Sequence, residues 1–428
     1  MKVSVEPKRN AWIDLLTRPS GHDASQDAIV DNILQDIKSH GDSALKKYTE
    51  KFDQVKLTTF KVSPEEITQA IDLVPEALKQ AIAIAKENIE TFHRSQERET
   101  KMVETMPGVK CWQRSMPIEK IGIYIPGGTA PLFSTVLMLA TPAAIAGCKE
   151  IILCSPPDRS GKINPAILFA ASLCGVTQIF KSGGAQAIAA MAYGTKEIPS
   201  VSKIFGPGNS FVTAAKMKVQ QEGIAIDMPA GPSEVLICAD ESADPSWVAI
   251  DLLSQAEHGI DSQVILVTDS EKVVKDVQKQ LDLLLKALPR VKMASGALSH
   301  SHAIIFKKIS DQIDFINAYA PEHLILNHAQ ADMIAEKINN AGSVFLGPYS
   351  PESVGDYASG TNHTLPTSAY ARAYSGVNLD SFTKKITYQK LTAEGLKLIG
   401  PVVEIMAEAE QLEAHRLAVT MRIEKMNK

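Results

Sequence analysis

Cysteine is scarce in this 428-residue sequence, which contains five scattered cysteines and no C-x-x-C spacing. That pattern fits neither a disulfide-stapled scaffold nor a thiolate zinc site. The N-terminal stretch MKVSVEPKRNAW also lacks a continuous apolar segment, so we expect no secretory signal peptide. Together the two absences predict a protein of the reducing cytoplasm.

An excess of charge of one sign is also missing. Lys+Arg 44 against Asp+Glu 49 gives a formal net charge of −5 at pH 7, which argues against a nucleic-acid partner. One uncharged stretch, residues 121–148, is long enough to cross a bilayer, but Pro126, Pro131 and Pro142 interrupt it. We therefore expect no membrane partner and interpret the stretch as buried α/β structure.

Apolar residues make up 45% of the chain, enough for a large core, and 428 residues exceed what a single core holds. Residues 24–100 show helical periodicity. From residue 120, short β-rich runs that end in Gly or Pro alternate with helical segments, and a second such series follows residue 235. The predicted fold class is therefore α/β, with two tandem doubly wound, incomplete Rossmann-like parallel-sheet domains, a helical N-terminal region and a helical C-terminal tail.

These patterns predict a discontinuous domain organisation. Residues 1–23 form an N-terminal arm, and residues 24–119 plus 236–377 form the first α/β domain. Residues 120–235 form a second, inserted α/β domain that carries the glycine-rich turns. Residues 378–428 form a tail of separate helices, LTAEGLKLI and then VEIMAEAEQLEAHRLAVTMRIEKM, which packs back on the chain or reaches a partner subunit.

Three glycine-rich turns follow strands of the predicted insert, and they contain Tyr124, Gln186 and Asn209. At the carboxyl ends of parallel strands, glycine permits close backbone approach and helix N-termini present free N–H groups to anions. Each turn alone also suits an ordinary βα connection, but three together favour a nucleotide or another phosphate ligand. The G-x-G-x-x-G fingerprint is absent, so spacing alone does not indicate NAD.

A mixed nitrogen and oxygen metal site is suggested by residues from separate segments. DPSWVAIDLLSQAEHG predicts a helix with Asp244 as its N-cap and with Gln255 and His258 on one face of its last turn. By itself this pair is a weak chelator, and a purely structural role is the alternative. With Asp356 of the polar loop PESVGDYASGTNHTLPT and His415 of the tail, it would give a divalent site with open positions.

Glu322 and His323 are adjacent in YAPEHLIL, where we expect them at a βα-type rim between a helix and a strand. A carboxylate beside an imidazole suits general acid–base catalysis, and a surface Glu–His pair is the alternative. His363 of the polar loop and Glu410 of the tail are further candidates. Long polar loops of this kind often line active sites.

Other protein classes compete with a nucleotide- and metal-dependent enzyme. An aldehyde dehydrogenase with a cysteine nucleophile needs an activated thiol, but we expect four of the cysteines to be buried, while Cys111 is undecided. The four are Cys148, Cys154, Cys174 and Cys238. A metal-dependent hydrolase of a small polar substrate would use the same ligands and base but leaves the glycine-rich turns unexplained. A two-lobed binding protein has no use for this set of residues.

Several long segments follow one another over most of the chain: IGIYIPGGTAPLFSTVLM, KSGGAQAIAAMAYGT, FGPGN, MPAGPSEVL, LSQAEHG, APEHL, GDYASGTNHTLPT and LEAHR. In these segments and in their order the sequence closely resembles the histidinol dehydrogenase family. The resemblance implies a zinc-dependent, four-electron oxidation of L-histidinol through L-histidinaldehyde to L-histidine. Two NAD would be consumed, in the final steps of histidine biosynthesis.

The resemblance also implies a role for each candidate residue. One Zn²⁺ per subunit would be held by Gln255, His258, Asp356 and His415. NAD would contact Tyr124, Gln186 and Asn209. The substrate would be bound by Ser233, Gln255, His258, His323, Asp356, Glu410 and His415, with His363 close by.

Glu322 and His323 would be the catalytic acid–base pair of the family. His323 would accept the hydroxyl proton, Glu322 would activate water to hydrate the aldehyde, and His323 would act again in the second oxidation. The resemblance further implies a homodimer in which the C-terminal tail completes the site of the partner subunit. Glu410 and His415 would then act across the interface.

Overall fold

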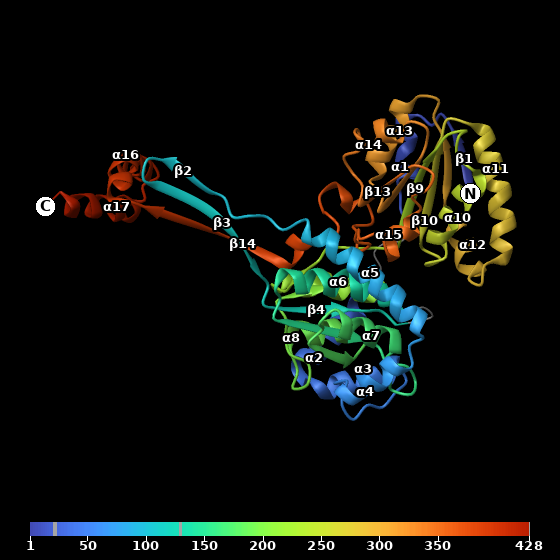
Figure 1. Cartoon of the computed structure of the whole chain (residues 1–428), viewed down its shortest axis with the longest axis horizontal. Coiled ribbons are helices and arrows are strands. Elements are labelled where there is room, and N and C mark those ends of the chain that lie inside the picture. The colour runs from blue at the N-terminus through green and yellow to red at the C-terminus, as the bar shows by residue number, and fades with distance from the viewer. Residues whose placement is uncertain (20–23, 128–130, 428) are drawn as a thin grey trace.

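The structure is a computed structural model that describes residues 1–19, 24–127 and 131–427. Figure 1 shows two α/β bodies and a long arm that extends away from them and carries the C-terminal end of the chain. Each body is built on one parallel sheet, whereas the arm contains an antiparallel sheet. The predicted α/β class with two parallel sheets is confirmed.

The first body contains a six-stranded sheet in the order β1-β11-β10-β9-β12-β13. Its strands are β1 (Lys2–Val5), β9 (Glu234–Ala239), β10 (Gln263–Thr268), β11 (His302–Ile305), β12 (His323–Asn327) and β13 (Ser343–Leu346). One face packs against α10 (Pro245–Ala256), α11 (Glu271–Leu284) and α12 (Val291–Ser299). The opposite face packs against α1 (Trp12–Leu15), α13 (Ile309–Tyr319) and α14 (Ala331–Ala335). Alternate side chains of the four inner strands are therefore buried on both faces.

The second body contains a five-stranded sheet in the order β6-β5-β4-β7-β8. Its strands are β4 (Lys120–Tyr124), β5 (Glu150–Ser155), β6 (Gln178–Lys181), β7 (Lys203–Phe205) and β8 (Ala225–Ile226). Helices α6 (Phe133–Ala146) and α7 (Pro165–Leu173) cover one face, and α8 (Gly184–Tyr193) and α9 (Ser210–Gln221) cover the other. In both bodies the first strand after the start of the βα series is central and the order reverses there, as in an incomplete Rossmann fold.

The N-terminal helices form an outer layer on the second body. They are α2 (Ala24–His40), α3 (Asp42–Phe52), α4 (Pro64–Asp72) and α5 (Glu76–Arg94). Helix α2 contacts α8 and α9, α4 contacts α7, and α5 contacts α6. This packing contradicts the predicted grouping of residues 24–119 with 236–377, because helical periodicity reveals an apolar face but not the surface that it covers.

The arm begins with a three-stranded antiparallel sheet in the order β14-β3-β2. Its strands are β2 (Met102–Met106), β3 (Val109–Pro117) and β14 (Thr383–Leu391). The prediction of a wholly helical tail is therefore wrong at its start. Most side chains of these strands are at least partly exposed, so the alternation that marks a half-buried strand is missing.

Two helices complete the arm, α16 (Ala393–Ala409) and α17 (Glu413–Met426). The predicted break near Gly400 is wrong, because α16 continues through Gly400 and Pro401. A Cβ atom on Gly400 would lie 2.4 Å from Ile423 Cδ1, so the glycine serves the close packing of α16 on α17. The chain instead turns at Gln411, whose φ is 59°. Among the described residues, no helix combines the length and apolar character needed to cross a membrane.

Candidate active site

The predicted acid–base pair lies at the amino edge of the six-stranded sheet. Glu322 precedes β12, and His323 is its first residue, in register with Val235 of β9. The predicted βα-type rim is therefore wrong, since the pair occupies the turn that leads from α13 into β12. Ala320 ends α13 in the left-handed region with φ 51°, which turns the chain back toward the sheet.

The imidazole of His323 is buried and has polar neighbours at both nitrogens. Nδ1 lies 3.0 Å from Gln255 Nε2 and 3.2 Å from the carbonyl oxygen of Glu234. Nε2 lies 3.2 Å from Asp356 Oδ1. Burial disfavours the charged imidazole, but the carboxylates of Glu322 and Asp356 outweigh it and raise the pKa of His323 well above its ordinary value. His323 is therefore a strong proton acceptor.

The carboxylate of Glu322 is equally enclosed. Its Oε2 accepts a hydrogen bond from the backbone N–H of Glu234 at 2.8 Å and lies 3.6 Å from His323 Nδ1. Burial raises the pKa of Glu322, which makes its ionised form a better base toward water. A carboxylate and an imidazole with raised pKa values thus share one buried corner of the sheet edge.

Gln255 directs its amide nitrogen at acceptors and leaves its oxygen without a partner. Nε2 lies 3.3 Å from the carbonyl oxygen of Glu234 and 3.4 Å from Glu322 Oε2. Oε1 is buried, and no described residue forms a hydrogen bond to it. A buried acceptor of this kind is costly unless something binds it, so Gln255 Oε1 fits the role of a metal ligand.

His258 follows α10 rather than belonging to it. The helix begins as predicted, with Asp244 Oδ1 accepting from Ser246 N–H at 2.8 Å, but it ends at Ala256. The His258 N–H still donates to the Gln255 carbonyl oxygen at 3.3 Å, which keeps the two residues in one turn. Only the predicted extent of the helix is wrong.

Asp356 and His363 close the site from the polar loop. Asp356 lies in α15 (Glu352–Tyr357), and its pKa is lowered because the hydrogen bond and charge of His323 outweigh the effect of burial. His363 Nδ1 donates to the carbonyl oxygen of Asp356 at 2.8 Å, and Nε2 lies 3.1 Å from Thr135 Oγ1 of α6. Burial lowers the pKa of His363 and favours its neutral form. His363 therefore joins this loop to the second body.

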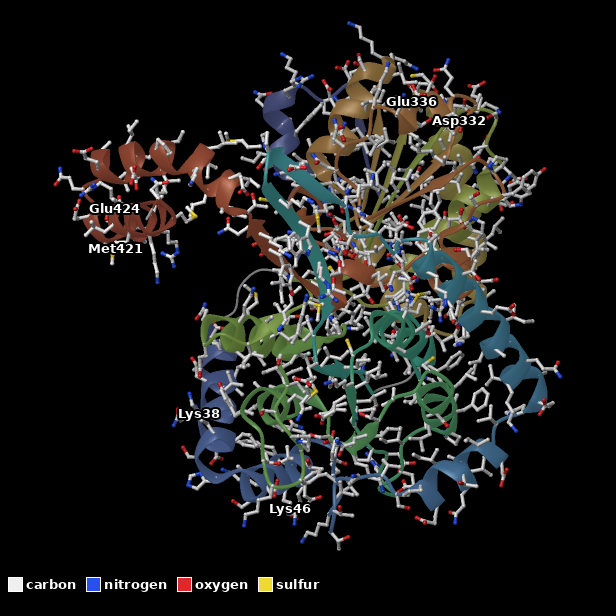
Figure 2. The ribbon with its side chains drawn as sticks, turned by 60° about the vertical axis from the view of Figure 1, so that its left-hand side comes forward. Lys38, Lys46, Asp332, Glu336, Met421 and Glu424 are labelled. Carbon is white, nitrogen blue, oxygen red and sulfur yellow. The ribbon has the colours of Figure 1, made fainter. Side chains whose placement is uncertain are left out.

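The structure does not bring Glu410 and His415 to the other candidates within one chain. Glu410 ends α16 and His415 lies in α17, at the tip of the arm (Figure 1). Figure 2 shows this tip, marked by Met421 and Glu424, standing clear of both bodies. Across residues 1–19, 24–127 and 131–427, no cluster of three or more His, Cys, Asp or Glu residues is arranged to hold a metal.

A cavity of ≈ 1280 Å³ opens at the carboxyl ends of β4, β5 and β6, and Tyr124, Gln186 and Asn209 all line it. The Tyr124 hydroxyl accepts from the Gly184 N–H at 3.0 Å, and burial raises the pKa of Tyr124 to about 12. Asn209 Oδ1 caps α9. The three residues thus share one cavity, while their contact with a nucleotide stays a prediction.

Arg18 and Glu234 were missed by the sequence reasoning. The Glu234 carboxylate pairs with Arg18 and accepts from the Ser368 N–H at 2.8 Å, while its backbone contacts Glu322 and His323. Ser233, a predicted substrate-binding residue, directly precedes it at the same edge. The sequence feature that could have indicated Glu234 is an acidic residue at the start of the apolar strand EVLICA.

The cysteines do not approach the acid–base pair. Four are buried as predicted, and burial raises the pKa of Cys148 and Cys174 to about 11 and that of Cys238 to about 12. Burial also raises the pKa of Cys154. Cys111 lies in β3 of the arm. The four buried thiols are therefore poor nucleophiles in this structure.

Comparison with known proteins identifies the family of this chain. The family model for histidinol dehydrogenase matches residues 16–423. A histidinol dehydrogenase of Bacteroides thetaiotaomicron is 56% identical over 423 residues, covering 99% of each chain. That of Bacteroides fragilis is 56% identical over 428 residues and covers 100% of each. A crystal structure of histidinol dehydrogenase from Elizabethkingia anophelis superposes with a TM-score of 0.98 at 55% identity, over 100% of this chain and 99% of that one.

Proposed function

This chain belongs to the histidinol dehydrogenase family, and from that premise we propose that it oxidises L-histidinol to L-histidine in histidine biosynthesis. The proposed reaction is a four-electron oxidation through L-histidinaldehyde that requires zinc and consumes two NAD. The observation that carries it is the buried pair Glu322 and His323 beside the unpartnered Oε1 of Gln255. Family membership supports a dehydrogenase, and a metal-dependent hydrolase has no comparable support.

The residues at the site fit a zinc ion. Gln255 Oε1, the His258 imidazole and the Asp356 carboxylate would be the ligands from one chain, and His415 of a second copy would be the fourth. When bound, zinc would hold and polarise the substrate, and NAD would accept a hydride in each oxidation. Ser233 at the same strand edge and Glu410 beside His415 would contact the substrate.

His323 would be the base in both oxidations. Its Nε2, which lies 3.2 Å from Asp356 Oδ1, would accept the substrate hydroxyl proton. A base must be unprotonated, and Asp356 beside Nε2 stabilises the protonated form. Neutralising the Asp356 charge with a cation would bring the pKa of His323 closer to the working pH.

Glu322 would act between the two oxidations. Its carboxylate would take a proton from water as that water adds to the aldehyde, giving the hydrated form that His323 then deprotonates. The Glu234 N–H fixes the orientation of Oε2 without itself titrating. The two proton-accepting groups are adjacent, so the substrate would not have to leave between the steps.

NAD would bind in the cavity lined by Tyr124, Gln186 and Asn209. Carboxyl ends of parallel strands and the N-termini of α8 and α9 meet there, as dinucleotide binding requires. The hydrogen bond between His363 and Thr135, in the first turn of α6, joins the polar loop of the candidate site to the second body. That connection would bring the reactive ends of NAD and substrate together.

In a homodimer with shared active sites, the second subunit would cover the exposed arm of the first. Helix α17 has no buried residue, and α16 exposes large apolar side chains, including Val402 at 51% and Ile405 at 68%. Exposed apolar side chains on a two-helix arm indicate a surface that another protein chain covers. We propose a second copy of the chain, so that Glu410 and His415 enter the partner subunit's site. The natural compartment would be the cytoplasm.

The experiment is to incubate the purified protein with L-histidinol and NAD and to identify the product by chromatography. L-Histidine should form, a chelator should abolish its formation, and Zn²⁺ but not Mg²⁺ should restore it. Absence of L-histidine in the zinc-loaded protein would refute the proposed function.

A further inference from the structure

The cavity in which we propose that NAD binds is also lined by a carboxylate that the proposed mechanism does not use. Asp53 follows α3 and lines the cavity together with Tyr124 and Gln186. Its Oδ2 is buried, and no described residue forms a hydrogen bond to it. Burial raises the pKa of Asp53 to about 6, so the carboxyl group is still ionised at neutral pH. A carboxylate without a partner in a cavity can accept hydrogen bonds from a bound ligand.

Asp53 lies over the end of the second strand of the βα series. Pro156 directly follows β5, and a Cβ atom on Gly183 would lie 2.5 Å from Pro156 Cβ and 3.3 Å from Asp53 Oδ1. Asp53 is therefore beside both Pro156 and Gly183, the N-cap of α8. In dinucleotide-binding folds the adenosine ribose lies at the end of the second strand, where an acidic side chain accepts from its hydroxyls. Here the acidic group would come from the N-terminal helical layer.

The other carboxylates that line the cavity already have partners. Glu66 Oε2 forms an ion pair with Lys181 at 2.7 Å, so its charge is compensated although Oε1 receives no hydrogen bond from a described residue. Asp158 Oδ1 accepts from the Ser160 N–H at 2.8 Å and from the Lys162 N–H at 3.0 Å, which ties it to its own turn. Within the described part of the chain, Asp53 forms no ion pair. It is therefore the carboxylate most available to a ligand.

We propose that Asp53 binds the hydroxyls of the adenosine ribose of NAD and makes the protein select NAD over NADP. This inference rests on the proposed function, since it assumes that the cavity binds NAD. A carboxylate accepts hydrogen bonds from a vicinal diol, whereas the 2′-phosphate of NADP would bring a second negative charge to the same buried place. Lys51 and Lys162 also line the cavity and could meet that phosphate once the carboxylate charge is removed.

The test compares the wild type with Asp53→Asn, and with Asp158→Asn as the matched control from the same cavity. Dissociation constants for NADH and NADPH are measured by calorimetry without substrate, and kcat/KM is then measured for NAD and NADP with L-histidinol. Asp53→Asn should weaken NADH binding about tenfold. It should also lower the ratio of the NADPH dissociation constant to the NADH dissociation constant. Asp158→Asn should change neither the NADH dissociation constant nor this ratio by more than about twofold.

An analogue of NADH without the adenosine 2′-hydroxyl completes the test. The wild type should bind it more weakly than NADH, and Asp53→Asn should bind the two about equally. An unchanged preference in Asp53→Asn, or a change only in Asp158→Asn, would overturn the assignment of Asp53. Failure of the wild type to bind NADH at all would instead refute the proposed function, so the two failures are distinguishable.

Discussion

Arg18 and Glu234 form a bidentate ion pair, with Arg18 Nε 2.9 Å from Glu234 Oε1 and Nη2 3.0 Å from Oε2. The side chains are 11% and 2% exposed. The guanidinium also lies 3.7 Å from the ring centroid of Tyr319 and donates to its carbonyl oxygen. Because the backbone of Glu234 contacts both Glu322 and His323, the pair anchors the N-terminal segment to the acid–base site.

Replacing Arg18 should therefore destabilise the fold. Arg18→Met leaves the Glu234 carboxylate buried and unpaired, and we expect the free energy of unfolding to fall by about 3 kcal/mol. The control is Arg9→Met, which removes an ion pair with Asp314 whose side chains are 68% and 45% exposed. That change should cost less than about 1 kcal/mol. Urea unfolding at one chain concentration measures both, and equal losses would contradict a special role for Arg18.

Substitutions of Glu322 and His323 should affect different steps of the reaction. His323→Ala should slow both oxidations by about a hundredfold or more, because it removes the base from each. Glu322→Gln should mainly slow the oxidation of supplied L-histidinaldehyde, because hydration of the aldehyde loses its base. Both variants should keep their zinc, measured by atomic absorption. Equal losses in the two steps for Glu322→Gln would refute this division.

A shared active site predicts complementation between two inactive variants. His323→Ala removes a residue that a subunit contributes to its own site. His415→Ala removes a residue that the arm contributes to the partner subunit's site. In a dimer of one chain of each kind, one site carries both changes and the other carries neither. Random reassembly should therefore recover about a quarter of the wild-type activity. If each site belonged to one chain, mixing would recover none.

The stability of the protein should depend on pH through Glu352. Burial raises the pKa of Glu352 to about 8, and Ser254 Oγ donates to its Oε1 at 2.6 Å. Between the unfolded value of about 4.3 and about 8, the unfolded chain releases a proton that the folded chain keeps. Glu352 therefore lowers stability as pH rises, by at most about 1.4 kcal/mol per pH unit.

Glu352→Gln removes this titration while keeping an acceptor for Ser254. The variant should gain stability relative to the wild type as the pH is raised from about 5 to about 8. Urea unfolding at several pH values measures the difference. A difference that stays constant with pH would show that Glu352 titrates normally in the folded protein.

Local sequence patterns predicted the elements that depend on neighbouring residues. The capping signal at Asp244 and Pro245 marks the start of α10, and the apolar run EVLICA marks β9. The cysteines inside apolar runs are buried for the same reason. In each case a few adjacent side chains determine the local conformation and burial.

Pairings between distant segments could not be predicted in this way. Arg18 meets Glu234 from the far end of the chain, and β14 pairs with β3 although neither strand has a buried face. The position of Asp53 over Pro156 depends on where α3 packs, which periodicity does not specify. The resemblance named candidate site residues, whereas the contacts that orient them depend on the fold.

We propose above all that one site performs two successive oxidations. The most direct test is to run the zinc-loaded protein to completion with excess NAD and to count the NADH formed per L-histidinol consumed. We expect about two NADH per L-histidinol, with no free aldehyde accumulating. One NADH per substrate, with L-histidinaldehyde released, would contradict it.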